Sequence, residues 1–130
     1  MGKKLQEIIK ASTFGVREGT WVYCKVASKP AGDHFFVSQD KDEITVVTTV
    51  DKLGELDLIE RNEENYKLIA LNVSVPFYAV GFLAAVSNAI AKAGMNILII
   101  STYSKDYILV KEQTLEKAQK TLIDLGFKES

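Results

Sequence analysis

The sequence predicts an α+β fold, because hydrophobic patterns of the strand and helix types alternate along its second half. Residues 66–75 alternate like a strand, residues 80–93 have apolar side chains at helical spacing, and residues 96–103 contain an almost continuous apolar run. A short polar turn leads to a further strand at 106–110, and a second helix follows. This order is the split βαβ plan of ferredoxin-like domains.

Three stretches of the chain have the signals of amphipathic helices. The first lies near the start of the sequence, where lysines occupy the opposite face. Gly94 stands where the second helix needs a left-handed residue after its C-terminus. The third helix has Thr114 as a candidate N-cap and ends at Gly126. The apolar positions of the three helices are Leu5, Ile8 and Ile9; Leu83, Val86 and Ile90; and Leu115, Ala118, Leu122 and Leu125.

The first half of the chain is expected to be mostly β-structure. Residues 20–26 are rich in strand-forming side chains, and a turn containing proline and glycine follows at 29–33. Two further β-prone runs, 34–38 and 43–50, are separated by polar residues and predict a hairpin. Residues 51–65 mix leucines with acidic side chains, so we expect a connector with one helical turn.

The predicted sheet lacks one strand of the ferredoxin-like plan. That plan adds a strand after the last helix, but only residues 127–130 remain, and they are too polar and too few. An uncovered sheet edge invites pairing with other chains. We therefore expect a strand of the first half, with residues 21–26 as the best candidate, to dock beside the sheet or complete it.

A faint internal repeat supports a division into two lobes. Residues 41–46 resemble residues 105–110 in their order of charged and apolar side chains. The alternative is that any two hairpins with alternating apolar residues look alike. If the repeat is a duplication, the first lobe, residues 1–64, is degenerate, because the turn at 30–33 replaces its crossover helix. We expect this lobe to pack on the complete one, residues 65–130.

The composition argues against nucleic-acid and membrane partners. The formal net charge is −1, so nothing attracts the chain to a polyanion or an anionic bilayer. Cys24 is the only cysteine, which excludes a disulfide within the chain and favours a reducing compartment. The start of the sequence has no apolar signal region, and no apolar stretch has the length of a transmembrane helix. These features predict a cytoplasmic protein.

The sequence contains no recognisable catalytic apparatus. Its only histidine, His34, sits beside two phenylalanines at a strand start, and neither it nor Cys24 has a partner at metal-ligand spacing. No phosphate-binding glycine motif occurs, so we expect neither an enzyme nor a cofactor. An RNA-recognition module shares the order of elements, but residues 107–111 lack the basic and aromatic pattern of its central strand.

Three segments of the second half resemble ACT domains. They are Val-Gly-Phe-Leu-Ala-Ala-Val at 80–86, Ala-Gly-Met-Asn-Ile at 93–97, and Ile-Ser-Thr-Tyr-Ser-Lys-Asp-Tyr-Ile-Leu-Val at 100–110. The chain is similar to small bacterial tandem-ACT proteins and to lobes of the eukaryotic cytosolic arginine sensor, and more distantly to aspartate kinase regulatory lobes. The resemblance implies a non-catalytic, homodimeric regulatory module that binds an amino acid near the loop between its first strand and first helix. A departure is the stretch at 77–80, which lacks the acidic residue of many amino-acid-binding kinase lobes.

The same loop is a candidate ligand site on physical grounds. Backbone N–H groups at a helix start are unpaired and the helix dipole is positive there, so a carboxylate could bind, and Gly81 would permit close approach. Asp106 could counter an ammonium group, or it is simply a turn residue. Ser101 and Thr102 could face the loop or only bond within a strand end. The candidate ligand-binding residues are Tyr78, Ala79, Val80, Gly81, Phe82, Asn96, Ile97, Ser101, Thr102 and Asp106.

Two roles stay open for some of these residues. Tyr78, together with Phe77, is expected to wall a pocket or to pack against a partner subunit. Asn96 follows Gly94 and is expected either to contact a ligand or only to stabilise the turn. The alternative function for the whole chain is a structural homodimerisation module without a ligand.

Overall fold

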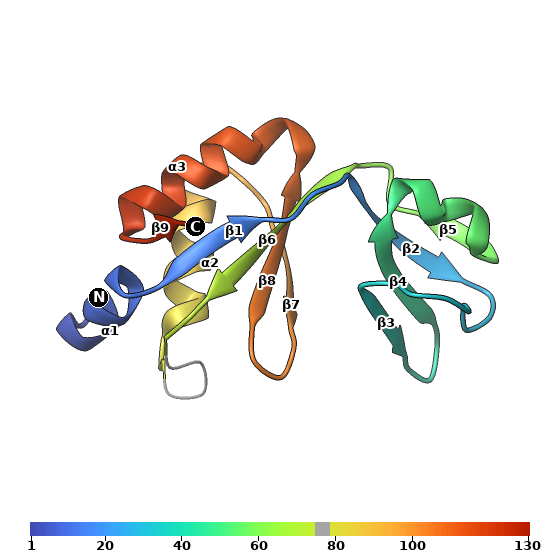
Figure 1. Ribbon diagram of the computed structural model, residues 1–130, viewed down its shortest axis with the longest axis horizontal. Helices are drawn as coiled ribbons and strands as arrows, with labels where there is room; N and C mark the ends of the chain where they lie inside the picture. The colour runs from blue at the N-terminus through green and yellow to red at the C-terminus, as the bar shows by residue number, and fades with distance from the viewer. Residues whose placement is uncertain (75–78) are drawn as a thin grey trace. The chain divides into compact units, whose positions relative to one another are not determined.

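The structure is a computed structural model that describes residues 1–74 and 79–130 (Figure 1). The chain forms two compact units, which are described separately below. Unit 1 comprises residues 1–17 and 67–130, and unit 2 comprises residues 18–66. Unit 1 is therefore assembled from both ends of the sequence. The contiguous division of the chain at residue 64 into two related lobes stays a prediction.

Unit 1 consists of a mixed sheet and three α-helices among the described residues. The helices α1, α2 and α3 are all formed where the apolar spacing predicts them. Gly94, after α2, has a φ of 83°, and Gly126, after α3, has a φ of 128°, so both helices stop at glycines in the left-handed region. The elements are α1 (Lys3–Lys10), β1 (Thr13–Val16), β6 (Tyr66–Asn72, whose first residue belongs to unit 2), α2 (Phe82–Lys92), β7 (Leu98–Ser101), β8 (Asp106–Lys111), the 3₁₀ turn η3 (Glu112–Thr114), α3 (Leu115–Leu125) and β9 (Lys128–Glu129).

The strands of unit 1 lie in the order β9-β1-β6-β8-β7. β1 runs antiparallel to β6, with Phe14 opposite Leu71, and β9 runs parallel to β1. A strand of the first half completes this sheet, as expected, but it is β1 and not residues 21–26, which meet β6 only where Trp21 pairs with Tyr66. β1 follows α1 after two residues and brings a fully buried phenylalanine to the edge. The end of the chain, expected to be too short for a strand, adds the two-residue β9.

The core of unit 1 lies between one face of this sheet and helices α2 and α3. Side chains at alternate positions of β6 and β8 point into it and meet the apolar faces of the two helices. Three phenylalanine rings join β1, α2 and the C-terminal segment through edge-to-face contacts at centroid distances of 5.7 and 6.3 Å. The central members are Phe14, Ile69, Leu71, Phe82, Val86, Ile90, Ile108, Val110, Ala118, Leu122 and Phe127.

Unit 2 is a smaller sheet with no α-helix among its residues. Its elements are β2 (Trp21–Val26), β3 (Phe36–Gln39), β4 (Ile44–Thr49), the 3₁₀ helix η1 (Val50–Glu55) and β5 (Leu58–Arg61). The first strand and the hairpin are confirmed, and the helical turn expected in the connector is η1. β5 was not predicted, because Leu58 and Ile59 are both exposed and give no alternating pattern. Val22, Cys24, Val26 and Val46 form the core, against which η1 contributes Leu53.

Both units use the same strand order. Unit 2 has β5-β2-β4-β3, and the four corresponding strands of unit 1 are β1-β6-β8-β7. The two similar stretches noted in the sequence, 41–46 and 105–110, lead into β4 and β8, which hold the same place in their sheets. In unit 2 a loop takes the place of α2, and η1 takes the place of α3. The predicted ferredoxin-like α+β fold is thus confirmed.

Candidate functional site

Unit 1 has a cavity of about 380 Å³ at the N-terminal end of α2. Its described walls come from the loop before the helix, from the first helical turn, and from the start of β8. The cavity therefore joins the two parts of the chain that the sequence singled out, the loop around Gly81 and the carboxylate of Asp106. The lining residues are Ala79, Gly81, Phe82, Leu83, Ala84 and Asp106.

The start of α2 leaves two backbone donors without a partner inside the helix. Gly81 has a φ of 83°, a left-handed conformation that favours glycine. The Phe82 N–H donates to the Ala79 carbonyl at 3.0 Å, and the Ala85 N–H donates to the Gly81 carbonyl at 2.9 Å. No side chain of the described residues caps this helix. The N–H groups of Leu83 and Ala84 are therefore the ones available at the positive end of the helix dipole.

Asp106 brings a negative charge to the same cavity. It is the first residue of β8 and lies opposite Ser101 of β7. The Ser101 hydroxyl donates to Asp106 Oδ1 at 2.6 Å, which fixes the orientation of the carboxylate. In the described part of the chain, no group bonds to the second oxygen, Oδ2. The cavity thus combines N–H donors for an anion with a free carboxylate oxygen for a cation.

Residues 62–124 match the model of the ACT domain family. The chain contains an ACT domain. The matched segment runs from β6 almost to the end of α3, so the ACT domain includes every element that forms the cavity. The family resemblance expected from the sequence is confirmed.

Solved structures share the fold of the whole chain at low sequence identity. A Vibrio cholerae protein of unknown function, described as a possible transport protein, aligns over 95% of this chain and 97% of its own, with a TM-score of 0.80 and 22% identity. An Agrobacterium tumefaciens protein aligns over 92% of both chains, with a TM-score of 0.71 and 19% identity. The regulatory subunit of aspartate kinase from Thermus thermophilus aligns over 86% of this chain and 95% of its own, with a TM-score of 0.63 and 10% identity. No curated protein sequence matches the chain.

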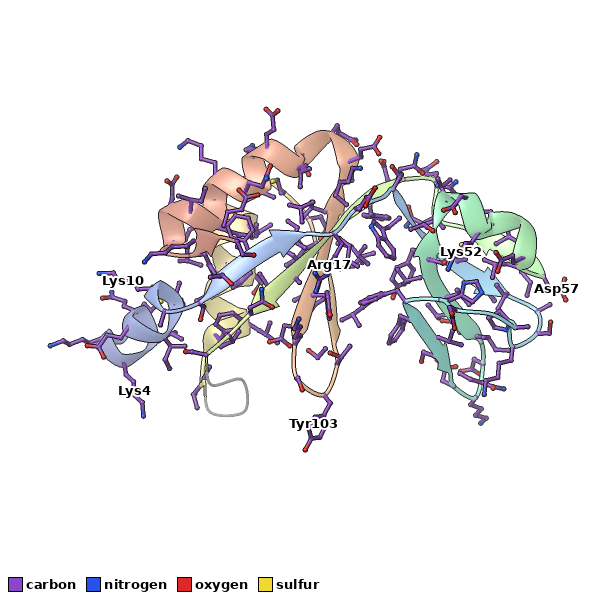
Figure 2. All side chains as sticks on the ribbon, viewed as in Figure 1. Lys4, Lys10, Arg17, Lys52, Asp57 and Tyr103 are labelled. Atoms are coloured by element: carbon purple, nitrogen blue, oxygen red, sulfur yellow. The ribbon has the colours of Figure 1, made fainter. Side chains whose placement is uncertain are left out.

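The structure places the other described candidate residues of the ACT domain outside the cavity lining. Thr102 closes the β7–β8 hairpin, since its N–H and its hydroxyl both donate to the Lys105 carbonyl, at 2.8 and 3.2 Å. Val80 is 90% exposed beside the cavity, and Tyr78, like Phe77, lies outside the described residues. Tyr103 projects from the tip of the hairpin, as Figure 2 shows, and is 85% exposed.

Asn96 and Ile97 lie beyond the opposite end of the helix from Gly81. The eleven residues of α2 separate the two ends by about 16 Å at 1.5 Å per residue. Asn96 Oδ1 accepts the Ile97 N–H at 3.0 Å, which is the turn-stabilising role. Ile97 packs against the core of unit 1. Neither residue lines the cavity.

Sequence reasoning missed Leu83 and Ala84 as cavity residues. Leu83 was assigned only to the apolar face of the helix, and Ala84 has no functional group to draw notice. The signal was available in their position, because the second and third residues of a helix supply its free N–H groups. The ring of Phe82, a predicted site residue, belongs to the core of unit 1, and only 3% of the residue is exposed.

The described residues include no cluster of three or more His, Cys, Asp or Glu side chains that could hold a metal ion. The His34 side chain is fully buried in unit 2, where Nδ1 lies 3.0 Å from Thr48 Oγ1 and Nε2 lies 3.1 Å from the Ala31 carbonyl. The ring therefore fastens the loop after β2 to β4, a structural role. No helix in the described ranges is long and apolar enough to cross a membrane.

Proposed function

We propose that this protein is a non-catalytic regulatory module that binds a free α-amino acid in the cavity at the start of α2. The ligand carboxylate accepts hydrogen bonds from the N–H groups of Leu83 and Ala84. The ligand ammonium pairs with Asp106. The observation that carries the proposal is that uncapped helix donors and a free carboxylate oxygen line one cavity.

The lining also favours a class of ligand side chain. Apart from Asp106, the described walls are backbone, alanine methyl groups and the leucine side chain of Leu83. A buried polar ligand group would find no partner on such walls, so a small apolar side chain fits best. The match to the ACT family and the shared fold with an aspartate kinase regulatory subunit support a regulatory role. We place the protein in the cytoplasm, where the free thiol of Cys24 would persist.

Calorimetric titration with an amino acid and with the carboxylic acid that lacks its amino group tests these assignments. We expect Asp106→Asn to weaken amino-acid binding by about tenfold, because a hydrogen bond to a charged group contributes about 1.5–3 kcal/mol. Affinity for the des-amino acid should not fall. Ser101→Ala should weaken amino-acid binding less, since it only frees the carboxylate to rotate.

Asp124→Asn is the matched control, because Asp124 pairs with Lys120 on the exposed face of α3. It should leave both affinities unchanged. An amino acid that binds Asp106→Asn as tightly as the original protein would contradict the role of this carboxylate.

A second candidate function is homodimerisation without a ligand. β7 pairs with β8 on one side only within the described chain, and Ile99 on this edge strand is 41% exposed. An unpaired edge is a template for pairing with a second copy. Light scattering across a dilution series measures the association. A tight dimer that responds to no amino acid would favour this candidate over the proposed sensor.

A further inference from the structure

The two units carry large charges of opposite sign, although the net charge of the chain is only −1. Unit 2 has eleven acidic and five basic side chains, a formal charge of −6. Unit 1 has six acidic and eleven basic side chains, a formal charge of +5. A strong charge asymmetry between parts of a chain is a sign of charged partners. The charge of unit 2 favours a cationic one.

Strand β5 forms an open edge of the unit 2 sheet, because among the described strands it pairs with β2 alone. The Asp57 carbonyl accepts the N–H of the residue after β2, and the Asn62 N–H donates to a carbonyl of β2, both at 2.8 Å. Asp57 and Asn62 therefore direct these groups toward β2. Since successive residues of a strand direct their backbone groups to opposite sides, the N–H and C=O groups of Leu58 and Arg61 face the open side.

Two large apolar side chains of β5 are exposed at this edge. Leu58 is 41% exposed and Ile59 is 57% exposed. A bulge in the pairing places Glu60 opposite Lys25 and Leu58 opposite Val26, so Ile59 has no residue opposite it on β2. An edge strand with free backbone groups and exposed apolar side chains is a template for pairing with another extended chain.

Acidic side chains surround the same edge. Asp57, Glu60, Glu63 and Glu64 lie in or next to β5, against a single basic residue, Arg61. Glu60 and Glu63 are exposed and take no part in the ion pairs of the described chain. Asp57 points away from the body of unit 2 in Figure 2. The Arg61 guanidinium is held by the loop after β5, where Nη2 donates to a side-chain oxygen at 2.5 Å. The edge is therefore negatively charged on balance.

These charges discriminate between the chains that could add to the edge. A second copy that paired through its own β5 would bring the same carboxylates face to face, which destabilises a strand pair. A nucleic acid or an anionic bilayer would be repelled. An extended segment in which lysine or arginine alternates with apolar residues matches the backbone groups, the apolar side chains and the charge.

We propose that the β5 edge of unit 2 binds an extended basic segment of another protein as an added strand. The backbone of this segment pairs with the free groups of Leu58 and Arg61. Its apolar side chains lie against Leu58 and Ile59, and its basic side chains lie near the surrounding carboxylates. The surface is independent of the amino-acid cavity, whose described lining belongs to unit 1.

Three synthetic peptides test the proposal by fluorescence anisotropy. The probe is a labelled heptapeptide of alternating lysine and valine. The second peptide has proline in place of the central valine, which removes a backbone donor, and the third groups the same lysines together. We expect the probe to bind with a Kd on the order of 0.1 mM or tighter at low salt, and more weakly as salt screens the charges. Both comparison peptides should bind at least about fivefold more weakly.

Variants locate the binding edge. Ile59→Lys should weaken probe binding about tenfold, because it removes an apolar contact and adds a charge of the same sign as the probe. Val37→Lys is the matched control, since Val37 is 39% exposed on β3, the opposite edge strand, and the change adds the same charge to unit 2. It should change probe binding by less than about twofold. Glu60→Gln should weaken binding by about two- to threefold.

Hydrogen exchange of the original protein reports on the backbone directly, without any variant. The probe should slow exchange of the Arg61 amide, because an added strand would pair with it. A probe that does not bind, an unchanged Arg61 amide, a proline or grouped-lysine peptide that binds as tightly, or equal binding by Ile59→Lys would each overturn the proposal. Self-association that Ile59→Lys abolishes would also overturn it, by assigning the edge to a second copy.

Discussion

Units 1 and 2 place their strands in the same order but cover their sheets in different ways. In unit 1 the crossovers are the helices α2 and α3, and together with β1 and the C-terminal segment they bury three phenylalanine rings. In unit 2 the corresponding connections are a loop and the 3₁₀ helix η1, and the core is three valines and a cysteine. The strand order therefore does not require the helices. The connections instead decide how large a core each sheet can bury.

The largest expected effect is the loss of stability when a core side chain of either unit is truncated to alanine. Phe14→Ala in unit 1 should lower the free energy of unfolding by about 3–5 kcal/mol, because it removes a fully buried ring and leaves a cavity. Val46→Ala in unit 2 should lower it by about 2 kcal/mol, since only two methyl groups are lost. Urea denaturation followed by circular dichroism measures both values. Val37→Ala, at a partly exposed position, should change stability by less than about 0.5 kcal/mol.

If Phe14→Ala cost less than Val46→Ala, β1 would not be an integral strand of unit 1. This comparison is a sharp test of β1 because Phe14 lies far in sequence from the core residues that β6, α2, β8 and α3 contribute.

A smaller effect is expected at the glycines of the two crossovers. Gly81 precedes α2 with a φ of 83°, and Gly32 in the loop of unit 2 has a φ of 85°. Gly81→Ala and Gly32→Ala should each lower stability by about 1–2 kcal/mol, because a Cβ disfavours the left-handed region. Among the described residues, the atom nearest to a Cβ added at Gly81 is Leu5 Cδ2 at 3.5 Å, so the cost there is conformational.

Gly54→Ala in η1 is the matched control, since its φ is outside the left-handed range and an added Cβ would have open space. Thermal unfolding of the three variants should show losses at Gly81 and Gly32 and none at Gly54. Equal losses at all three positions would show that the left-handed conformation is not the cause.

The smallest effect concerns Cys24 in the core of unit 2. Burial raises the pKa of this thiol, and the nearby Arg61 charge opposes part of the rise. The protonated thiol therefore stabilises the fold fully below the pKa of an unfolded cysteine, about 8.5, and this contribution is lost as the pH rises through the higher folded value. Native protein at pH 8 should react with a thiol reagent at least about tenfold more slowly than protein in urea.

The Cys24→Ala variant has no thiol at this position. Its stability should therefore fall less than that of the original protein when the pH is raised into the alkaline range. Comparable reaction rates in the native and urea-unfolded states would instead mean that the unit 2 core opens readily.

The sequence predicted the elements whose stabilising residues lie close together along the chain. Apolar residues at helical spacing predicted α1, α2 and α3, and glycine signals predicted where α2 and α3 stop. The partner of β6 could not be predicted in this way, because four residues containing a glycine, Thr13–Val16, carry little pattern. Their selection over Trp21–Val26 depends on the burial of Phe14 among residues from the other end of the chain.

For the candidate site, as for the fold, the sequence predicted the local features but not which residues come together. Gly81 and Asp106 carry local chemistry, an αL helix start and a carboxylate after a turn, and the structure brings both to one cavity. Asn96 carries similar local chemistry, but its distance from the cavity is set by the length of α2, which no motif records. Local side-chain chemistry thus predicted what the residues could do, and the fold decided which of them act together.

A thermal-shift screen of the purified protein against the proteinogenic amino acids tests the central claim most directly. A ligand that binds only the folded state raises the melting temperature, by an amount equivalent to about 2.7 kcal/mol at one hundred times its Kd. We predict that a small apolar amino acid raises the Tm in a concentration-dependent way and that its des-amino acid raises it less. A flat response across the whole panel would contradict the amino-acid sensor and leave the homodimerisation module as the function of this chain.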